Sequence, residues 1–384
     1  MKNFFHRCGA VFMVLIIVTT AGCGGGREPS GNEADGIPSL ADSYESEFLI
    51  GVALGRSEAA GEVPRATPLI TRHFNSITPE NLLKWERVHP EPGRYNVGPS
   101  DQYVEFGESN GMVIVGHTLV WHNQVPEWVF RSEDGGEINR EALLQRMEDH
   151  ITTVIGRYRG RIDGWDVVNE AVLDNGEVRS TRWYELIGPD YVEKAFQFAR
   201  TADPEAELYY NDYNLWKPAK REAVIKLVRR LQQNGIRVDG IGMQAHLDID
   251  YPPVSMIEKS IEAFAELGVN VMITELDIDV LPDEDDVDAE IVDGGTVPPS
   301  LDPYRNGLSD SVQQQLTHRY TELFRLFRTH DDKITRVTFW GLDDGHSWLN
   351  NFPIRGRTNY PLLFDRTYQP KPALDAIIRL TNQQ

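Results

Sequence analysis

Short apolar runs rich in Val, Ile, Leu and aromatic residues alternate with longer amphipathic stretches along most of the chain. Such runs predict strands of a parallel sheet, because both faces of that sheet are buried. Eight runs are predicted to be strands: residues 48–54, 74–80, 112–121, 162–170, 206–214, 240–248, 269–277 and 336–344. The stretches between them carry apolar residues at three- and four-residue spacing, which predicts helices such as 140–158.

Eight strand–helix alternations predict an α/β fold, a single (β/α)8 TIM barrel over residues 43–384. A doubly wound open sheet is the structural alternative. That fold would carry a glycine-rich phosphate loop after its first strand, and no such loop follows residues 48–54.

The N-terminus predicts an export signal. Lys2 and Arg7 precede a short apolar run, and TTAGC ends at Cys23 like a bacterial lipoprotein cleavage box, although Thr20 replaces its usual Leu. Residues 1–22 are therefore expected to be a lipoprotein signal peptide, with Cys23 acylated and residues 23–42 a flexible tether. The protein would then be exported and held at a bacterial membrane only by its lipid. Ordinary secretion is the alternative.

The formal net charge of −21 argues against nucleic acid or an anionic membrane face as the main partner, and a neutral partner fits better. The only cysteines are Cys8 and Cys23, so the mature chain is expected to have no disulfide and no cysteine metal site. A monomer is expected.

The active site of an eightfold barrel lies at the carboxyl ends of its strands, and here those ends carry polar and aromatic residues. A lone His or Trp there is more often an ordinary core residue, but eight such strand ends together predict a functional site. The candidates are Glu80, Asn81, Lys84, His117, Trp121, His122, Gln124, Asn169, Glu170, Asn211, Asp212, Tyr213, Gln244, His246, Glu275, Asp277, Trp340 and Trp348.

Two carboxylates each end an apolar run, Glu170 and Glu275. Glu275 and Asp277 share a strand face, and Gln244 and His246 are expected to do the same on the neighbouring strand. The two ring nitrogens of His246 could then bridge both acids and hold Glu275 ionised, as a nucleophile requires.

Glu170 follows Asn169 and has no cationic neighbour in the sequence. A setting with little charge favours a protonated carboxyl, which suits a general acid. Two carboxylates in different settings are what hydrolysis of a glycosidic bond requires.

Seven stretches resemble motifs of glycoside hydrolase family 10, whose members are mostly endo-β-1,4-xylanases: FNSITPENLLKWE, GHTLVWHNQVPEW, WDVVNEAV, YYNDYN, GIGMQAHL, ITELDI and FWGLDDGHSW. The resemblance runs from about Phe48 to Leu380, with every motif in order. It implies a retaining endo-β-1,4-xylanase that acts on xylan and xylo-oligosaccharides without a cofactor or metal.

Carried over by motif, Glu170 would be the acid/base and Glu275 the nucleophile, with His246 and Asp277 orienting Glu275. A bulky Trp where the hydroxymethyl group of glucose would sit favours xylan. The resemblance also implies sugar contacts from Glu80, Asn81, Lys84, His117, Trp121, Gln124, Asn169, Gln244, His246, Trp340 and Trp348.

Two other functions compete with this one. A metal-dependent barrel hydrolase could use His117, His122, Glu170 and His246 as ligands, but no His-x-His pair ends the first strand. A non-catalytic glycan-binding surface barrel would be expected to have lost one of the two strand-end glutamates. The loop at residues 280–309 is longer than in compact family members. The resemblance therefore does not predict which residues form the product-side sugar sites.

Overall fold

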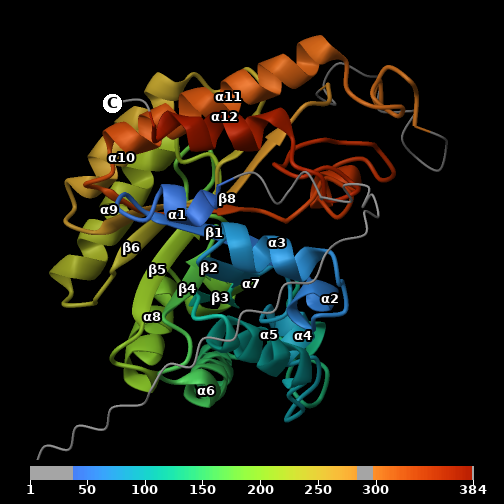
Figure 1. The fold of residues 1–384 in the computed structure, drawn as a ribbon. Helices are drawn as coiled ribbons and strands as arrows, with labels where there is room; N and C mark the ends of the chain where they lie inside the picture. The colour runs from blue at the N-terminus through green and yellow to red at the C-terminus, as the bar shows by residue number, and fades with distance from the viewer. Residues whose placement is uncertain (1–37, 283–296, 383–384) are drawn as a thin grey trace, which may run out of the picture.

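The structure, a computed structural model, describes residues 38–282 and 297–382 (Figure 1). The predicted signal peptide, Cys23 and part of the predicted loop 280–309 lie outside these residues. The strands are β1 (Leu49–Leu54), β2 (Ser76–Pro79), β3 (Val113–Val120), β4 (Gly164–Asn169), β5 (Glu207–Asp212), β6 (Gly240–Met243), β7 (His246–Asp248), β8 (Asn270–Asp279) and β9 (Ile334–Phe339).

The strands close into a barrel. Neighbours pair in the order β6-β5-β4-β3-β2-β1-β9-β8-β7, and a further pairing of β6 with β8 completes the ring. Every pair is parallel. Both β6 and β7 pair with β8, β6 with its first part and β7 with its last part. The predicted (β/α)8 TIM barrel is confirmed, and the open-sheet alternative is excluded because the sheet closes on itself.

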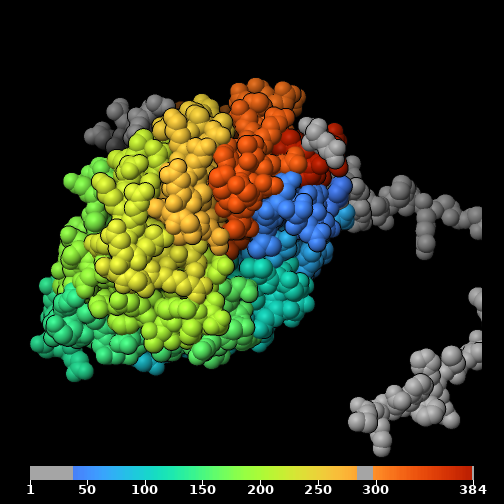
Figure 2. Space-filling view, turned by 90° about the vertical axis from the view of Figure 1, so that its left-hand side faces the viewer, coloured from blue at the N-terminus to red at the C-terminus, as the bar shows by residue number. Residues whose placement is uncertain are grey.

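Helices surround the barrel and bury their apolar faces against it. They are α1 (Leu40–Ser43), α2 (Arg56–Ala59), α3 (Ala66–His73), α4 (Trp85–Val88), α5 (Gly98–Ser109), α6 (Arg140–Tyr158), α7 (Arg182–Ile187), α8 (Tyr191–Ala202), α9 (Pro218–Gln233), α10 (Val254–Ala265), α11 (Asp310–Thr329) and α12 (Pro372–Leu380). Figure 2 shows α9, α10 and α11 side by side on one outer face. Within the described part of the chain, no helix has the length and apolar character needed to cross a membrane.

Two sequence expectations differ from the structure. The prediction of one strand over 240–248 is wrong, because the chain breaks between β6 and β7, where Ala245 has φ 63°. The predicted boundary between tether and barrel, 42/43, falls inside α1. Leu40 of α1 is fully buried, and the Tyr44 hydroxyl donates a 2.7 Å hydrogen bond to the carbonyl of Ile377 in α12. The two ends of the described chain therefore pack together.

A buried histidine pair lies next to the strand ends. His89 follows α4 and His150 belongs to α6; their Nδ1 atoms are 3.2 Å apart, and the side chains are 5% and 0% exposed. The ring of Trp85 stacks on His150 with centroids 3.6 Å apart. Burial lowers the pKa of His89 to about 4, and burial also lowers the pKa of His150 well below its ordinary value. Both rings are therefore neutral at pH 7, one donating and one accepting.

This pair predicts a loss of stability in acid. Below about pH 6.5 the unfolded chain protonates both histidines while the folded chain does not, so the free energy of unfolding falls by about 1.4 kcal/mol per pH unit for each. For His89 the fall continues to about pH 4. His89→Gln should lower stability at pH 7 but flatten its dependence between these pH values, measured by denaturant unfolding. His318→Gln, at a side chain that is 68% exposed, is the control and should keep the slope of the unsubstituted protein.

Candidate active site

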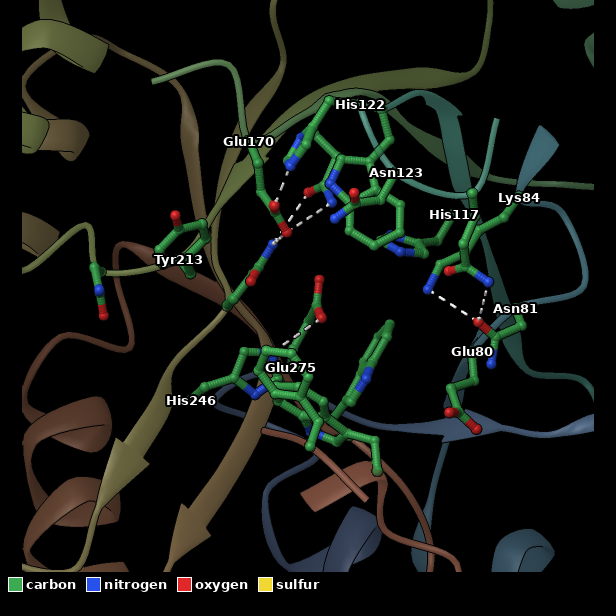
Figure 3. A pocket seen from close by; sticks show the side chains of 18 of the residues that line it. Glu80, Asn81, Lys84, His117, His122, Asn123, Glu170, Tyr213, His246 and Glu275 are labelled. Atoms are coloured by element: carbon green, nitrogen blue, oxygen red, sulfur yellow. Dashed lines mark hydrogen bonds and ion pairs between the residues drawn. The ribbon is translucent and has the colours of Figure 1, made fainter. Parts of the chain in front are cut away.

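A cleft of about 870 Å³ lies at the carboxyl ends of the strands. Every sequence-predicted contact residue lines it, and Asp277 lies fully buried behind His246. The lining residues are Glu80, Asn81, Lys84, His117, Trp121, His122, Asn123, Gln124, Asn169, Glu170, Arg179, Tyr213, Asn214, Gln244, His246, Glu275, Trp340, Trp348, Asn351 and Phe352. Figure 3 shows Glu170 and Glu275 pointing into one space from opposite sides.

Glu275 and Asp277 point the same way from β8, as predicted, and His246 bridges them. The register of β7 and β8 sets His246 opposite Asp277. His246 Nδ1 lies 2.8 Å from Asp277 Oδ1, and its Nε2 lies 3.3 Å from Glu275 Oε2. The predicted bridge is confirmed. The bridge forms although Gln244 and His246 do not lie on one strand. Glu275 and Asp277 both lie on β8, and β7 places His246 opposite Asp277.

The charges around Glu275 keep it ionised. Burial alone would raise the pKa of Glu275, which is 4% exposed, but the hydrogen bond from His246 and the nearby His117, His246 and Lys84 hold that pKa below its ordinary value. Burial would likewise lower the pKa of His246, yet Asp277 and Glu275 raise it to about 10. At neutral pH the triad is thus an imidazolium between two carboxylates.

Glu170 follows the last residue of β4 in a left-handed conformation, with φ 60°. Its Oε1 accepts hydrogen bonds from Gln244 Nε2 at 3.1 Å and from Asn169 Nδ2 at 3.2 Å. Glu170 has no cationic neighbour in the sequence, as noted above, but the fold brings His122 and Arg179 close to it. His122 Nδ1 lies 3.9 Å from Oε2, and Arg179 Nε donates a 2.9 Å bond to its main-chain carbonyl.

A chain of hydrogen bonds joins the two carboxylates through three amides. Gln244 Nε2 donates to Asn169 Oδ1 at 3.1 Å as well as to Glu170. Asn211 Nδ2 donates to Asn169 Oδ1 at 3.0 Å and to Glu275 Oε1 at 2.7 Å. Both glutamates are therefore anchored to one network, and a shift of either would disturb the other.

Asn211 holds this network; it was among the strand-end candidates but not among the expected sugar contacts, and it lies one residue before the end of β5. Thr274 donates a 2.6 Å hydrogen bond to Asn211 Oδ1, which turns the amide nitrogen toward Glu275. A Cβ on Gly242 of the next strand would lie 2.2 Å from Asn211 Oδ1, so only glycine leaves space for this amide. The signal in the sequence was the strand-end Asn together with the glycine of the following strand.

Beside Glu80 and Asn81, a lysine lies against the ring of a tryptophan. Lys84 is 7% exposed; its Nζ donates to Asn81 Oδ1 at 3.1 Å and lies 4.7 Å from the Trp121 ring centroid. Gln124 Nε2 donates to the same Asn81 oxygen at 3.3 Å. Burial raises the pKa of Glu80 and lowers that of Lys84. These groups offer donors and acceptors suited to hydroxyl groups.

Aromatic rings and a histidine form the walls. The Trp348 indole donates a 2.7 Å hydrogen bond to Asp277 Oδ2 and lies 4.9 Å from His246 between ring centroids. His117 packs edge-on against Trp340 at 5.2 Å, and its Nδ1 lies 2.9 Å from Asp166 Oδ2. Trp340 and Trp348 therefore lie beside His246, as their ring contacts show.

Loops contribute lining residues that strand-end reasoning did not find, because no periodic pattern marks them. These are Asn123, Arg179, Asn214, Asn351 and Phe352. Phe352 is 56% exposed and stacks on Trp348 with centroids 5.0 Å apart. The sequence offered only one indication that Phe352 belongs to the site, which is that this aromatic residue follows closely after Trp348.

The ligands proposed for a metal hydrolase have other partners here. His117 and His246 direct Nδ1 to Asp166 and Asp277. In the described ranges, the ligand atoms that gather within 4.8 Å of one another belong to Glu258, Glu262 and His330. None of these three lines the cleft.

The barrel and its paired carboxylates define a glycoside hydrolase that works with two acidic groups. Residues 39–380 match the sequence profile of glycosyl hydrolase family 10. Endo-1,4-beta-xylanase A of Xylanibacter ruminicola is 47% identical over 348 residues, 90% of this chain and 94% of that protein.

Solved structures agree. A GH10 endoxylanase from a sugarcane soil metagenome is 46% identical with a TM-score of 0.85, covering 89% of this chain and 99% of that one. A mutant structure in complex with xylotriose is 39% identical with a TM-score of 0.80, covering 88% and 99%. The chain belongs to glycosyl hydrolase family 10.

The triad predicts that His246 stays protonated well above neutral pH. Nitrogen NMR of histidine-labelled protein should show both ring nitrogens of His246 protonated at about pH 8, where an ordinary histidine is neutral. Asp277→Asn removes the larger of the two raising charges and should bring the titration of His246 down by more than one pH unit. A neutral His246 at pH 8 in the unsubstituted protein would contradict this account of the site.

Proposed function

We propose that this protein is a retaining endo-β-1,4-xylanase, which hydrolyses internal β-1,4-xylosidic bonds of xylan by double displacement. The observation that carries the proposal is the pair Glu170 and Glu275, which face one space and share one hydrogen-bond network. The relatives named endo-1,4-beta-xylanase and the xylotriose complex support the substrate class.

In the first step, the ionised Glu275 attacks the anomeric carbon and Glu170 gives its proton to the departing glycosidic oxygen. The product is a glycosyl-enzyme ester on Glu275. In the second step, Glu170 takes a proton from water, the water oxygen attacks the same carbon, and Glu275 leaves as a carboxylate. Two displacements restore the original stereochemistry. The bridge of His246 and Asp277 suits Glu275 to attack, since it favours the charged form.

The sugar contacts complete the proposal. Asn169 would bond the 2-hydroxyl of the sugar at the cleavage point; its amide bonds Glu170 directly and reaches Glu275 through Asn211, which supports this role. His117 and Lys84 would bind the other hydroxyls of that sugar, and Glu80, Asn81 and Gln124 the next one outward. Flat indoles cover the apolar faces of sugars, and a bulky Trp rejects the hydroxymethyl group of glucose chains.

The alternative of a non-catalytic glycan-binding barrel fits the cleft less well. A binding surface has no need of an imidazolium that holds a buried carboxylate ionised. Release of reducing sugar from xylan by the purified protein, with Glu275→Ala as the matched control, separates the two functions. No release by the unsubstituted protein would refute the proposed activity.

The two glutamates predict different defects. Glu275→Ala removes the attacking atom, so xylan and activated substrates should both fail. Glu170→Ala removes only proton transfer, so xylan hydrolysis should slow by about 100- to 10,000-fold. An aryl xylobioside with a good leaving group should still release a burst of phenol from the Glu170→Ala variant, followed by accumulation of glycosyl-enzyme. The reverse pattern would exchange the two roles.

We also propose that the protein is an exported bacterial lipoprotein that acts as a monomer. The support is the short apolar run and the box ending at Cys23, residues outside the described structure. Cys23→Ala should move the protein from the membrane fraction to the soluble exported fraction, where sedimentation should give the mass of one chain. An unlipidated, freely soluble form of the unsubstituted protein would contradict the anchor.

A further inference from the structure

The two carboxylates are held in different ways. Asn211 bonds Glu275 at Oε1 and His246 bonds it at Oε2, and Glu275 lies within the ten-residue strand β8. Glu170 lies beyond the end of β4, and its side chain accepts hydrogen bonds from Gln244 and Asn169, both at Oε1. The direction of the Glu170 side chain therefore depends on its main-chain conformation as well as on these two hydrogen bonds.

That main chain is in an uncommon conformation. A non-glycine residue at φ 60° costs about 1 kcal/mol or more and persists only where its surroundings fix it. Three hydrogen bonds surround it: Glu170 N donates to Asn211 O at 2.9 Å, Arg179 Nε donates to Glu170 O at 2.9 Å, and Ala171 N donates to the Tyr210 hydroxyl at 3.1 Å. Two of the three come from side chains, Arg179 and Tyr210.

Both side chains lead to one buried ion pair. The Tyr210 hydroxyl donates to Asp212 Oδ2 at 2.5 Å, and Asp212 Oδ1 lies 2.8 Å from Lys220 Nζ, with both charged side chains 0% exposed. Arg179 Nη2 donates to the Tyr213 hydroxyl at 2.7 Å. Tyr213 in turn bonds Asp212 through its main-chain nitrogen at 2.9 Å, and Lys220 Nζ lies 3.5 Å from its ring centroid.

We propose that Arg179, Tyr210 and the Asp212–Lys220 pair form a clamp that positions Glu170 for proton transfer. The inference rests on the proposed function of Glu170 as acid/base. Proton transfer requires a heavy-atom separation of about 2.6–3.2 Å, and a displacement of about 1 Å costs about 100-fold in rate. The clamp residues act through the backbone of Glu170, so they are positioning residues and need not touch the reacting atoms.

The clamp also accounts for a costly feature of the barrel. Burying the charges of Asp212 and Lys220 is expensive, and such a pair contributes little net stability compared with apolar residues. At this position it fixes the hydroxyl that receives the N–H of Ala171, next to Glu170. An ion pair that contributed only to packing would not need to be hydrogen-bonded, through Tyr210, to the main chain next to Glu170.

The test uses two substrates with Tyr210→Phe, which removes one hydroxyl. Xylohexaose has a poor leaving group and needs the proton of Glu170, whereas the first step of a dinitrophenyl xylobioside does not. We expect kcat/KM to fall about 10- to 100-fold on xylohexaose and less than about 3-fold on the aryl substrate. Arg179→Lys, which keeps the charge but loses the two-armed contact, should show the same split.

Tyr209→Phe is the matched control. It removes a buried hydroxyl from the same strand, one that donates a 2.6 Å bond to Glu207 away from the cleft. This variant should lose some thermal stability and keep its activity on both substrates. Equal losses on both substrates for Tyr210→Phe, or no loss on either, would overturn the clamp. Failure of the unsubstituted protein on both substrates would instead refute the proposed function.

A double-mutant cycle separates positioning from general support of the fold. In a Glu170→Ala background the clamp has no acid to position, so adding Tyr210→Phe should leave the phenol burst from the aryl substrate unchanged within about 2-fold. The measured effect of Tyr210→Phe on this burst is compared with its effect on xylohexaose in the protein that still has Glu170. If the two losses are equally large, Tyr210 does not act through Glu170, and the positioning role is wrong.

Discussion

The active site depends on one buried charge, the carboxylate of Glu275. A carboxylate that is 4% exposed is costly unless other groups compensate it. Here the imidazolium of His246 and the amide of Asn211 bond Glu275, and Asp277 keeps His246 protonated. Asn211 comes from β5, His246 from β7 and Asp277 from β8, so pairing between neighbouring strands brings these groups together. The Trp348 wall shares the same support, because its indole bonds the outer oxygen of Asp277.

The two carboxylates divide the chemistry according to how they are held. Glu275 is fixed at both oxygens within a long strand, which suits an atom that must attack at a defined angle. Glu170 is held at one oxygen and by its main chain, with Oε2 left open toward His122 and the cleft. A group that donates and then accepts a proton needs such an open oxygen. The hydrogen-bonded amides of Asn169, Asn211 and Gln244 hold the two carboxylates in a fixed position relative to each other.

Much of this was predictable from local pattern. Alternation in the run that ends at Asp277 predicted that Glu275 and Asp277 share a face, and that prediction is confirmed because β8 runs without a break. The run containing Gln244 and His246 read as one strand because Ala245 is not a typical turn residue, yet it adopts φ 63°. The role of Asn211 depends on Thr274 and Gly242 of other strands, and that of Arg179 on a loop. Such contacts are tertiary, so no single stretch of sequence contains them.

The most direct test is to trap the covalent intermediate. In a 2-fluoro xylobioside, the fluorine slows both displacements, and a good leaving group keeps the first one fast enough to occur. A retaining enzyme therefore accumulates the glycosyl-enzyme, because its hydrolysis is the slower step. Intact mass followed by peptide mapping should locate one fluoro-xylobiosyl group on Glu275, and proton NMR of normal turnover should show the β-anomer first. A label on Glu170, or no label together with an α-anomer as first product, would contradict the account.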